Sequence, residues 1–190
     1  MKRIVILASG SGTNAENIIK YFRGSDQITV TKVLSNKKDA KVLERAKRLK
    51  VPCRSFTREQ LNNTEELLNV LKATADYVVL AGFLWKIPSE IIDAFPNRII
   101  NIHPALLPKY GGKGMYGMHV HNAVVENNER VSGITIHFVN ENYDEGAIIF
   151  QKSIDVLPTD TAEDVAQKIH ILEYEYFPKI IETAILENDQ

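Results

Sequence analysis

The sequence has little that would mark a secreted, membrane or nucleic-acid-binding protein. It contains one cysteine, Cys53, so neither a disulfide framework within the chain nor a cysteine zinc cluster can form. Its 23 Lys and Arg residues nearly balance 24 Asp and Glu residues, giving a formal net charge of -1, and neither sign forms a long run. This balance argues against nucleic-acid or anionic-membrane partners.

Long apolar runs are also absent. After Met1-Lys2-Arg3, the first run of apolar or small residues covers only positions 4–9, too few for a signal-peptide core or a membrane span. A reducing compartment suits a lone cysteine, so we expect a cytoplasmic protein. The 190 residues include no linker, low-complexity tract or internal repeat, and we expect a single domain over 1–190.

Short apolar runs alternate with helical patterns in the first hundred residues. The run at 4–8 is continuously apolar, which is typical of a strand covered by helices on both faces. Similar runs cover 29–34, 77–81 and 98–102; helical stretches start near Asn14, cover about 40–49, and follow a capping box at Asn63 and Glu66. This order predicts a three-layer α/β fold with a mostly parallel, Rossmann-like sheet and helices on both faces.

The pattern changes after residue 130. Two strand-like runs, at 132–139 and 147–156, have only seven residues between them, which predicts an antiparallel or bent C-terminal strand pair. Beyond Pro158, Thr161 is placed to cap a long closing helix with apolar residues at helical spacing.

A glycine-rich loop, Gly10-Ser11-Gly12-Thr13-Asn14-Ala15, follows the first predicted strand and opens a helix. Its backbone N–H groups and the positive helix end could hold a phosphate. The loop matches the dinucleotide pattern G-x-G-x-x-A, but no acidic residue follows the second strand to hold the ribose of NAD, and Lys37 leaves NADP open. The hydroxyls of Ser11 and Thr13 suit a terminal phosphate monoester better than a buried diester.

A polar pair, Asn101 and His103, ends the apolar run at 98–102. Side chains alternate along a strand, so these two project from the same face. An Asn amide can donate to an oxygen that gains negative charge, and a His can move a proton near neutral pH. Open α/β folds bind ligands at the carboxyl ends of strands, so this position predicts an active site.

A second pair, Thr135 and His137, shares one face of the run at 132–139. The acidic loop that follows, 140–146, contains Asp144, and its carboxylates could orient and charge-stabilise an imidazole. Spacing alone does not decide which carboxylate does so. His119 and His121 raise the question of a metal, but no third ligand has an obvious local spacing, and we predict no metal site.

Five motifs together resemble the folate-dependent formyltransferases, and within them the phosphoribosylglycinamide formyltransferase family, over nearly the whole chain. They are Ser9-Gly10-Ser11-Gly12-Thr13-Asn14, Leu80-Ala81-Gly82-Phe83, the run from Asn101 to Tyr110, Gly133 to Val139, and Asp144-Glu145-Gly146. The long central motif marks the folate-dependent group, and the N-terminal loop narrows it to the glycinamide branch. The family transfers the formyl group of 10-formyltetrahydrofolate to the amine of glycinamide ribonucleotide in purine biosynthesis.

The resemblance also implies roles for particular residues. His103 would be the general acid/base, Asn101 would stabilise the tetrahedral oxyanion, and Asp144 would set the charge and orientation of the histidine. The substrate would contact Gly12, Thr13, Asn14, His170, Ile171, Leu172 and Glu173; the folate would contact Leu84, Trp85, Lys86, Ile87, Asn101, Asn140, Glu141, Asn142, Tyr143 and Asp144; Thr135 and His137 would support the site. The phosphate site would then lie in the half at about 1–100, and the folate and catalytic sites in the half at about 101–190.

Three departures from the family pattern stand out. Leu84-Trp85-Lys86-Ile87 replaces a segment that more often carries Met-Arg, Thr135 stands where serine is common, and the loop at 111–116 is longer than usual, either as a lid or as a plain insertion. The alternatives are a methionyl-tRNA formyltransferase, a formyltetrahydrofolate hydrolase and a non-catalytic NADP-binding module. The near-neutral charge disfavours the first, and the Asn101–His103 pair disfavours the last. We expect a monomer or a homodimer.

Overall fold

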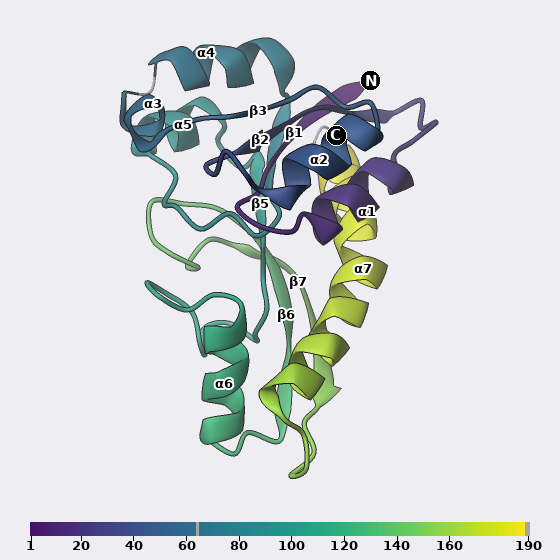
Figure 1. Ribbon diagram of the computed structural model, residues 1–190, viewed down its shortest axis with the longest axis vertical. Coiled ribbons are helices and arrows are strands. Elements are labelled where there is room, and N and C mark those ends of the chain that lie inside the picture. Colours follow the sequence, from purple (N-terminus) through teal and green to yellow (C-terminus); the bar gives the residue numbers. More distant parts are fainter. Residues whose placement is uncertain (64, 189–190) are drawn as a thin grey trace.

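The structure, a computed structural model, describes residues 1–63 and 65–188. Strands and helices alternate along most of this length (Figure 1). The strands are β1 (Lys2–Leu7), β2 (Ile28–Ser35), β3 (Cys53–Ser55), β4 (Tyr77–Leu80), β5 (Ile99–His103), β6 (Val131–Phe138) and β7 (Ile148–Asp155). The helices are α1 (Thr13–Tyr21), α2 (Lys41–Arg48), α3 (Arg58–Asn62), α4 (Glu65–Thr74), α5 (Ser89–Ala94), α6 (Met118–Glu126) and α7 (Ala162–Glu187).

All the strands of the described residues form one sheet in the order β3-β2-β1-β4-β5-β6-β7. The pairs from β3 to β5 are parallel, whereas β6 is antiparallel to both β5 and β7. The predicted α/β class, the mostly parallel sheet and the antiparallel C-terminal pair are therefore confirmed. Because β2 and β4 lie on opposite sides of β1, the chain reverses direction across the sheet between β1 and β4, and such a point forms a crevice at the carboxyl ends of the strands.

Two apolar layers enclose the sheet. Ile4 and Ile6 of β1 face a core shared with α1, α2, α6 and α7, and Val5 and Leu7 face a second core shared with α3, α4 and α5. This explains the unbroken apolar run of β1, since both faces of the strand are covered. Each such fully buried aliphatic side chain contributes about 1.5–3 kcal/mol of transfer free energy.

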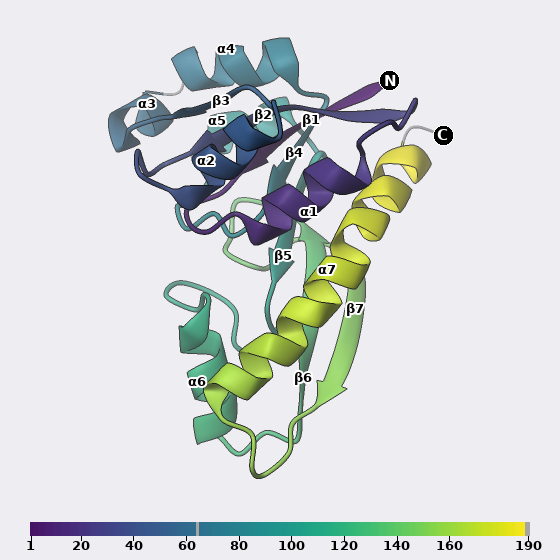
Figure 2. The ribbon, with the colours of Figure 1, turned by 45° about the vertical axis from the view of Figure 1, so that its right-hand side comes forward.

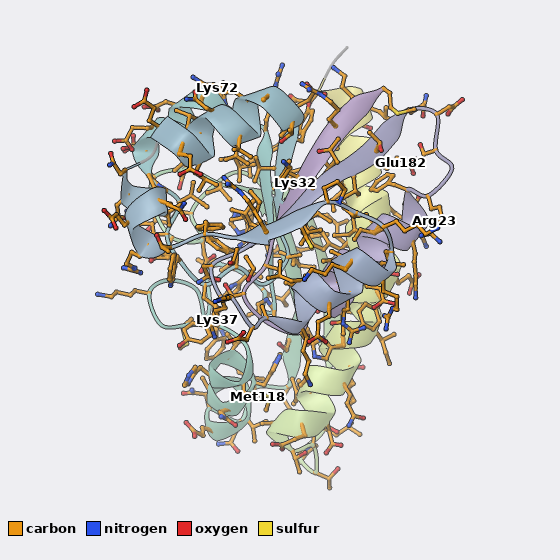
Figure 3. All side chains as sticks on the ribbon, turned by 45° about the horizontal axis from the view of Figure 1, so that its top comes forward. Arg23, Lys32, Lys37, Lys72, Met118 and Glu182 are labelled. Carbon is orange, nitrogen blue, oxygen red and sulfur yellow. The ribbon has the colours of Figure 1, made fainter. Side chains whose placement is uncertain are left out.

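Helix α7 crosses the parallel and antiparallel parts of the sheet and packs against α1 (Figure 2). As predicted, Thr161 caps it: its side chain accepts from the Asp164 N–H, and Asp164 accepts from the Thr161 N–H. The two helices are also joined by the Tyr21 hydroxyl, which donates to Glu182 at 2.6 Å; Glu182 is labelled in Figure 3. Through α7, the C-terminal part of the chain thus packs against α1 in the N-terminal part.

The short elements were not predicted from the sequence. Strand β3 has three residues, too few for a periodic pattern, and α3 and α5 have five and six. The predicted capping box at Asn63 was wrong, because Asn63 ends α3, and α4 begins at Glu65. The capping box in this region starts α3 instead, between Thr57 and Gln60, a T-x-x-Q signature visible in the sequence.

Within residues 1–63 and 65–188, no helix combines the length and apolar character needed to cross a membrane.

Candidate active site

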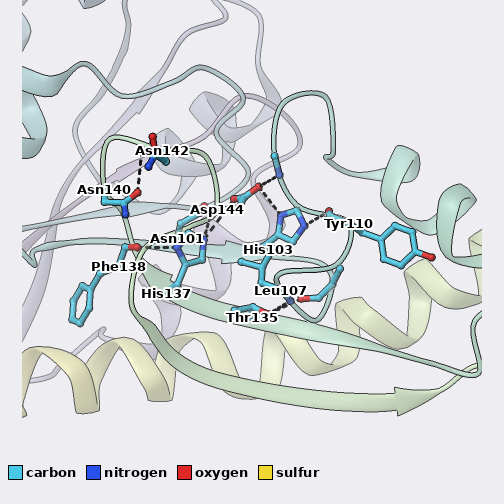
Figure 4. A network of polar contacts seen from close by, with 12 residues as sticks. Asn101, His103, Leu107, Tyr110, Thr135, His137, Phe138, Asn140, Asn142 and Asp144 are labelled. Carbon is cyan, nitrogen blue, oxygen red and sulfur yellow. Dashed lines mark hydrogen bonds and ion pairs between the residues drawn. The ribbon is translucent and has the colours of Figure 1, made fainter.

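The end of β5 and the facing part of β6 bring four polar side chains together (Figure 4). In the antiparallel register, Asn101 lies opposite His137, and His103 lies opposite Thr135. Directly opposed residues of antiparallel strands are close enough to contact each other. The two pairs that the sequence pattern placed on separate strands therefore share one face.

His103 is held by both of its ring nitrogens. Its Nε2 lies 2.7 Å from the carbonyl oxygen of Tyr110, which can only accept, so Nε2 carries a proton and donates. Its Nδ1 lies 3.6 Å from Oδ2 of Asp144. Burial lowers the pKa of His103, while the Asp144 charge and the Tyr110 carbonyl act in the opposite direction. The neutral ring thus keeps Nδ1 as its basic nitrogen, and a proton taken up there faces a carboxylate.

Asp144 connects the two histidines to the loop that follows β5. Its Oδ2 accepts from the Gly112 N–H at 2.9 Å, and its Oδ1 lies 3.6 Å from Nε2 of His137. Burial alone would raise the pKa of Asp144, but His137, the His103 charge and the Gly112 N–H outweigh it and hold the pKa below 3.8. At 3.6 Å neither imidazole nitrogen is within ordinary hydrogen-bond distance of the carboxylate, and Asp144 attracts each ring only when the nitrogen that faces it carries a proton.

The amide of Asn101 is oriented by His137. The Nδ1 of His137 lies 2.8 Å from the Phe138 carbonyl and must donate to it. In the neutral ring, Nε2 then accepts, and the Asn101 Nδ2 donates to it over 3.1 Å. One N–H of the amide is used in this way, and the second remains for a substrate oxygen.

Thr135 supports the loop from inside. It is fully buried: its Oγ1 accepts from the Leu107 N–H at 3.0 Å and donates to the Ala105 carbonyl at 2.7 Å. Gln151 of β7 also donates to this oxygen at 2.9 Å. Thr135 therefore anchors the backbone after His103 and Pro104 rather than contacting a ligand.

A cleft of about 660 Å³ opens at the carboxyl ends of β1, β4 and β5 and contains the catalytic candidates. At the point where the sheet order reverses, the Ser9 hydroxyl accepts from the Leu84 N–H at 2.9 Å and so ties the loop after β1 to the loop after β4. The cleft is thus located where open α/β sheets bind ligands.

One end of the cleft is formed by the glycine loop and α7. The lining residues there include Gly12, Thr13, Asn14, His170 and Glu173, all of them among the predicted substrate-binding residues. Glu173 is 6% exposed, and its Oε2 accepts from Asn14 Nδ2 at 2.9 Å and from His170 Nδ1 at 3.0 Å, which raises the pKa of His170. The Asn14 Oδ1 is buried and has no partner among the described residues, so a ligand donor could satisfy it.

The other end is more apolar and lies between the loops after β4 and β6. Leu84, Trp85, Lys86, Ile87, Asn140, Asn142 and Tyr143 line it. The ammonium of Lys86 lies 5.8 Å from the centroid of the Tyr143 ring, so the two loops also approach each other across the cleft. A cleft of this volume, lined at one end by the glycine loop and at the other by aromatic residues, can hold two small molecules side by side.

Three predicted binding residues do not line the cleft. Ile171 is 65% exposed, and Leu172 is packed into the core beneath α7. Glu141 is exposed and is not among the residues that line the cleft. On a helix, residues three or four apart share a face, as His170 and Glu173 do, so the intervening Ile171 and Leu172 lie on other faces of α7.

The structure adds lining residues that were not predicted as binding residues. They include Ser9, Phe83, Val139, His121, Lys37 and the loop 112–117. Lys37 is labelled in Figure 3. The longer loop after Tyr110 therefore borders the cleft. His121 is 3% exposed, burial lowers its pKa, and its Nδ1 has no partner among the described residues. Within the same residues no group of three or more His, Cys, Asp or Glu side chains is arranged for a metal ion.

The model of the family "Formyl transferase" matches residues 2–181, and the chain belongs to this family.

Two of the relatives that are similar in sequence carry the same name. The chain is 41% identical over 187 residues to the chloroplastic phosphoribosylglycinamide formyltransferase of Arabidopsis thaliana, covering 95% of this chain and 64% of the relative. It is 35% identical to the phosphoribosylglycinamide formyltransferase of Haemophilus influenzae, covering 95% and 86%. The chain thus spans less than two thirds of the plant relative and most of the bacterial one.

Solved structures show the same similarity. Glycinamide ribonucleotide transformylase 1 from Symbiobacterium toebii superposes with a TM-score of 0.86 at 37% identity, covering 95% of this chain and 86% of that one. Phosphoribosylglycinamide formyltransferase from Bacillus halodurans gives 0.86 at 34% identity, covering 96% and 94%.

Proposed function

We propose that the protein transfers the formyl group of 10-formyltetrahydrofolate to the amine of glycinamide ribonucleotide, in purine biosynthesis. The observation that carries this proposal is the position of the Asn101, His103 and Asp144 cluster, between the phosphate-type end and the apolar end of one cleft. The names of the relatives support the same reaction.

The free N–H of Asn101 is the proposed oxyanion donor. When an amine attacks a formyl carbonyl, negative charge develops on the carbonyl oxygen, and a pre-oriented donor stabilises it. The bond from Asn101 to His137 orients the amide before the substrate binds, so little reorganisation is needed. Removing such a donor typically costs about 10² to 10³ in kcat.

His103 is the proposed proton-transfer group: it takes a proton from the attacking amine and returns one to N10 of the folate as the bond between N10 and the formyl carbon breaks. The attacking amine must lose a proton, and the basic Nδ1 of His103 can take it, because Nε2 is already committed to the Tyr110 carbonyl. The resulting imidazolium faces Asp144 at 3.6 Å, whose depressed pKa keeps it charged near neutral pH. Asp144 therefore offsets part of the desolvation that disfavours a charged His103.

The two ends of the cleft correspond to the two substrates. Thr13 and Asn14 at the start of α1, with Gly12, suit the phosphate, and Glu173 suits the ribose hydroxyls, because its remaining carboxylate capacity can accept from them. The aromatic end suits a pterin ring: Tyr143 and Trp85 supply apolar lining, with Arg58 lying over the Trp85 ring, and the backbone of residues 84–87 and 140–142 offers hydrogen-bonding groups.

The proposal also includes the domain organisation, the partners and the location of the protein. We propose a single domain with the phosphate site in the half at about 1–100 and the folate and catalytic sites in the half at about 101–190, except that residues 84–87 of the first half also contact the folate. The near-neutral charge supports small molecules as the partners. We further propose a cytoplasmic monomer or homodimer.

The test mixes the purified protein with 10-formyltetrahydrofolate and glycinamide ribonucleotide and follows the folate absorbance. We expect turnover that depends on the ribonucleotide, and a loss of about 10² to 10⁴ in kcat for His103→Ala. Near-normal turnover of His103→Ala would refute the mechanism. Formyl release that is independent of the ribonucleotide would assign a hydrolase instead, and silence combined with NADP binding in calorimetry would assign a redox module.

A further inference from the structure

Helix α2 contacts three successive residues of the glycine loop, from the side opposite the cleft. The Val42 N–H donates to the Gly10 carbonyl at 3.2 Å, and Arg45 Nε donates to the Ser11 carbonyl at 2.8 Å. Val42 also packs on Gly12 so closely that a Cβ there would lie 2.3 Å from its Cγ2. The first three residues of the loop are therefore packed against α2.

These contacts decide where the N–H groups of the loop point. In a trans peptide the C=O and the N–H of one plane point in opposite directions. The Gly10 carbonyl shares a plane with the Ser11 N–H, and the Ser11 carbonyl shares a plane with the Gly12 N–H. With both carbonyls bonded to α2, both N–H groups point away from it, and neither has an acceptor among the described residues.

Arg45 is itself fixed by a buried carboxylate. Its Nη1 contacts Glu16 of α1, and Glu16 also binds Arg48 at 2.9 Å and Lys20 at 2.6 Å. Glu16 is 9% exposed, and contacts with Lys20 first and Arg45 second lower its pKa to about 2, so it stays charged at neutral pH. The planar guanidinium of Arg45 thus spans two fixed points, Glu16 and the Ser11 carbonyl, as a fork can and a single ammonium cannot.

We propose that Arg45 is a positioning residue for the substrate phosphate. It does not line the cleft. It holds the Ser11–Gly12 peptide so that the N–H, and not the carbonyl, faces the anion beside the first turn of α1. Without Arg45 this peptide can rotate and present a carbonyl oxygen to the phosphate. The inference rests on the proposed function, because it assumes that a phosphate occupies this end of the cleft.

The experiment compares Arg45→Met with Arg48→Met. Both variants remove one positive charge and one contact with Glu16, but only Arg45 contacts the loop. We expect Arg45→Met to raise KM for glycinamide ribonucleotide and Kd for ribose 5-phosphate about tenfold, the value of one hydrogen bond at a charged group, with kcat and the folate KM within about twofold. Arg48→Met should change none of them more than about twofold.

Arg45→Lys keeps the positive charge and the contact with Glu16, but it lacks the guanidinium that also reaches the Ser11 carbonyl. We expect it to bind ribose 5-phosphate as weakly as Arg45→Met does. Full affinity in Arg45→Lys, equal losses in the two Met variants, or an unchanged Arg45→Met would each overturn the inference.

Calorimetry with ribose 5-phosphate keeps this test apart from the test of the reaction. If the wild-type protein fails to formylate the ribonucleotide, the proposed function falls, and the calorimetric comparison still decides the role of Arg45. If the wild-type protein binds no ribose 5-phosphate, the role of Arg45 is refuted whatever the formyl transfer shows.

Discussion

Replacing Glu16 by Gln removes a charge that three cations surround in a nearly closed site. Its side chain is 11% exposed, whereas those of Arg45, Lys20 and Arg48 are 30%, 58% and 64% exposed. These cations lower the pKa of Glu16 from its ordinary value of 4.5 to about 2. The ionised form of Glu16 is therefore more stable in the folded protein than in the unfolded chain.

The size of the effect follows from this pKa difference. At about 1.36 kcal/mol per pH unit, the shift from 4.5 to about 2 sets an upper limit of about 3 kcal/mol. Two of the three cations are more than half exposed and are screened by solvent, which reduces the expectation to about 1–2 kcal/mol. Because the pKa is lowered on folding, this stability is present above pH 4.5 and is lost as the pH falls toward 2.

Urea unfolding of the wild type and Glu16→Gln at several pH values between about 7 and 3 tests the calculation. We expect the variant to lose about 1–2 kcal/mol at neutral pH and the difference to narrow below pH 4.5. Glu66→Gln is the control, since the ion pair of Glu66 with Arg54 is exposed and should be worth less than about 0.5 kcal/mol. Equal stabilities at pH 7, or a difference that persists unchanged at pH 3, would refute the reasoning.

Three further predictions concern the active-site strands. Asp144→Asn removes a charge that raises the pKa of His103, so the acid limb of the kcat profile should move to lower pH; a limb that stays in place in the pH–rate profile contradicts this. Thr135→Val leaves the buried Leu107 N–H and Ala105 carbonyl without their partner and should cost about 2–4 kcal/mol in urea unfolding, whereas Thr135→Ser should cost about 1 kcal/mol or less; equal losses would refute the role of the hydroxyl. In Gly133→Ala the new Cβ would lie 2.2 Å from the Lys152 carbonyl of β7, so the melting temperature should fall clearly. In Gly10→Ala a Cβ meets nothing within 4 Å, so similar melting temperatures of the two variants would contradict the prediction.

The parallel half of the fold was predictable because its signals are local. The run at Ile4–Ala8 is apolar at every position, and a strand must be so when helices cover both faces. The structure places Ile4 and Ile6 in one core and Val5 and Leu7 in the other, as that pattern requires. Strand β3, by contrast, is three residues long and forms because Val33, Leu34 and Ser35 of β2 offer it a partner. No pattern within three residues announces such pairing.

The candidate site was predictable where it depends only on the alternation of side chains along a single strand. Asn101 and His103 share a face because they are two residues apart, and Thr135 and His137 share one for the same reason. That the two faces coincide depends on the register of β5 against β6, which pairs Asn101 with His137. The sequence pattern treated these pairs separately, and it extended the α7 binding site to Ile171 and Leu172, which the helix turns away from the cleft.

The amino-acid sequence by itself determined which chemistry is available: an amide, an imidazole, a carboxylate and a glycine loop that starts a helix. These depend on residue type and on spacing over a few positions, and so they can be read without coordinates. Only the tertiary structure decided that the Tyr110 carbonyl takes one nitrogen of His103 and Asp144 faces the other, and that Asn14 meets Glu173 across 159 positions of the chain. Those contacts are set by how strands and helices pack, because hydrogen bonds and charge interactions depend on distances of a few ångströms that sequence separation does not encode.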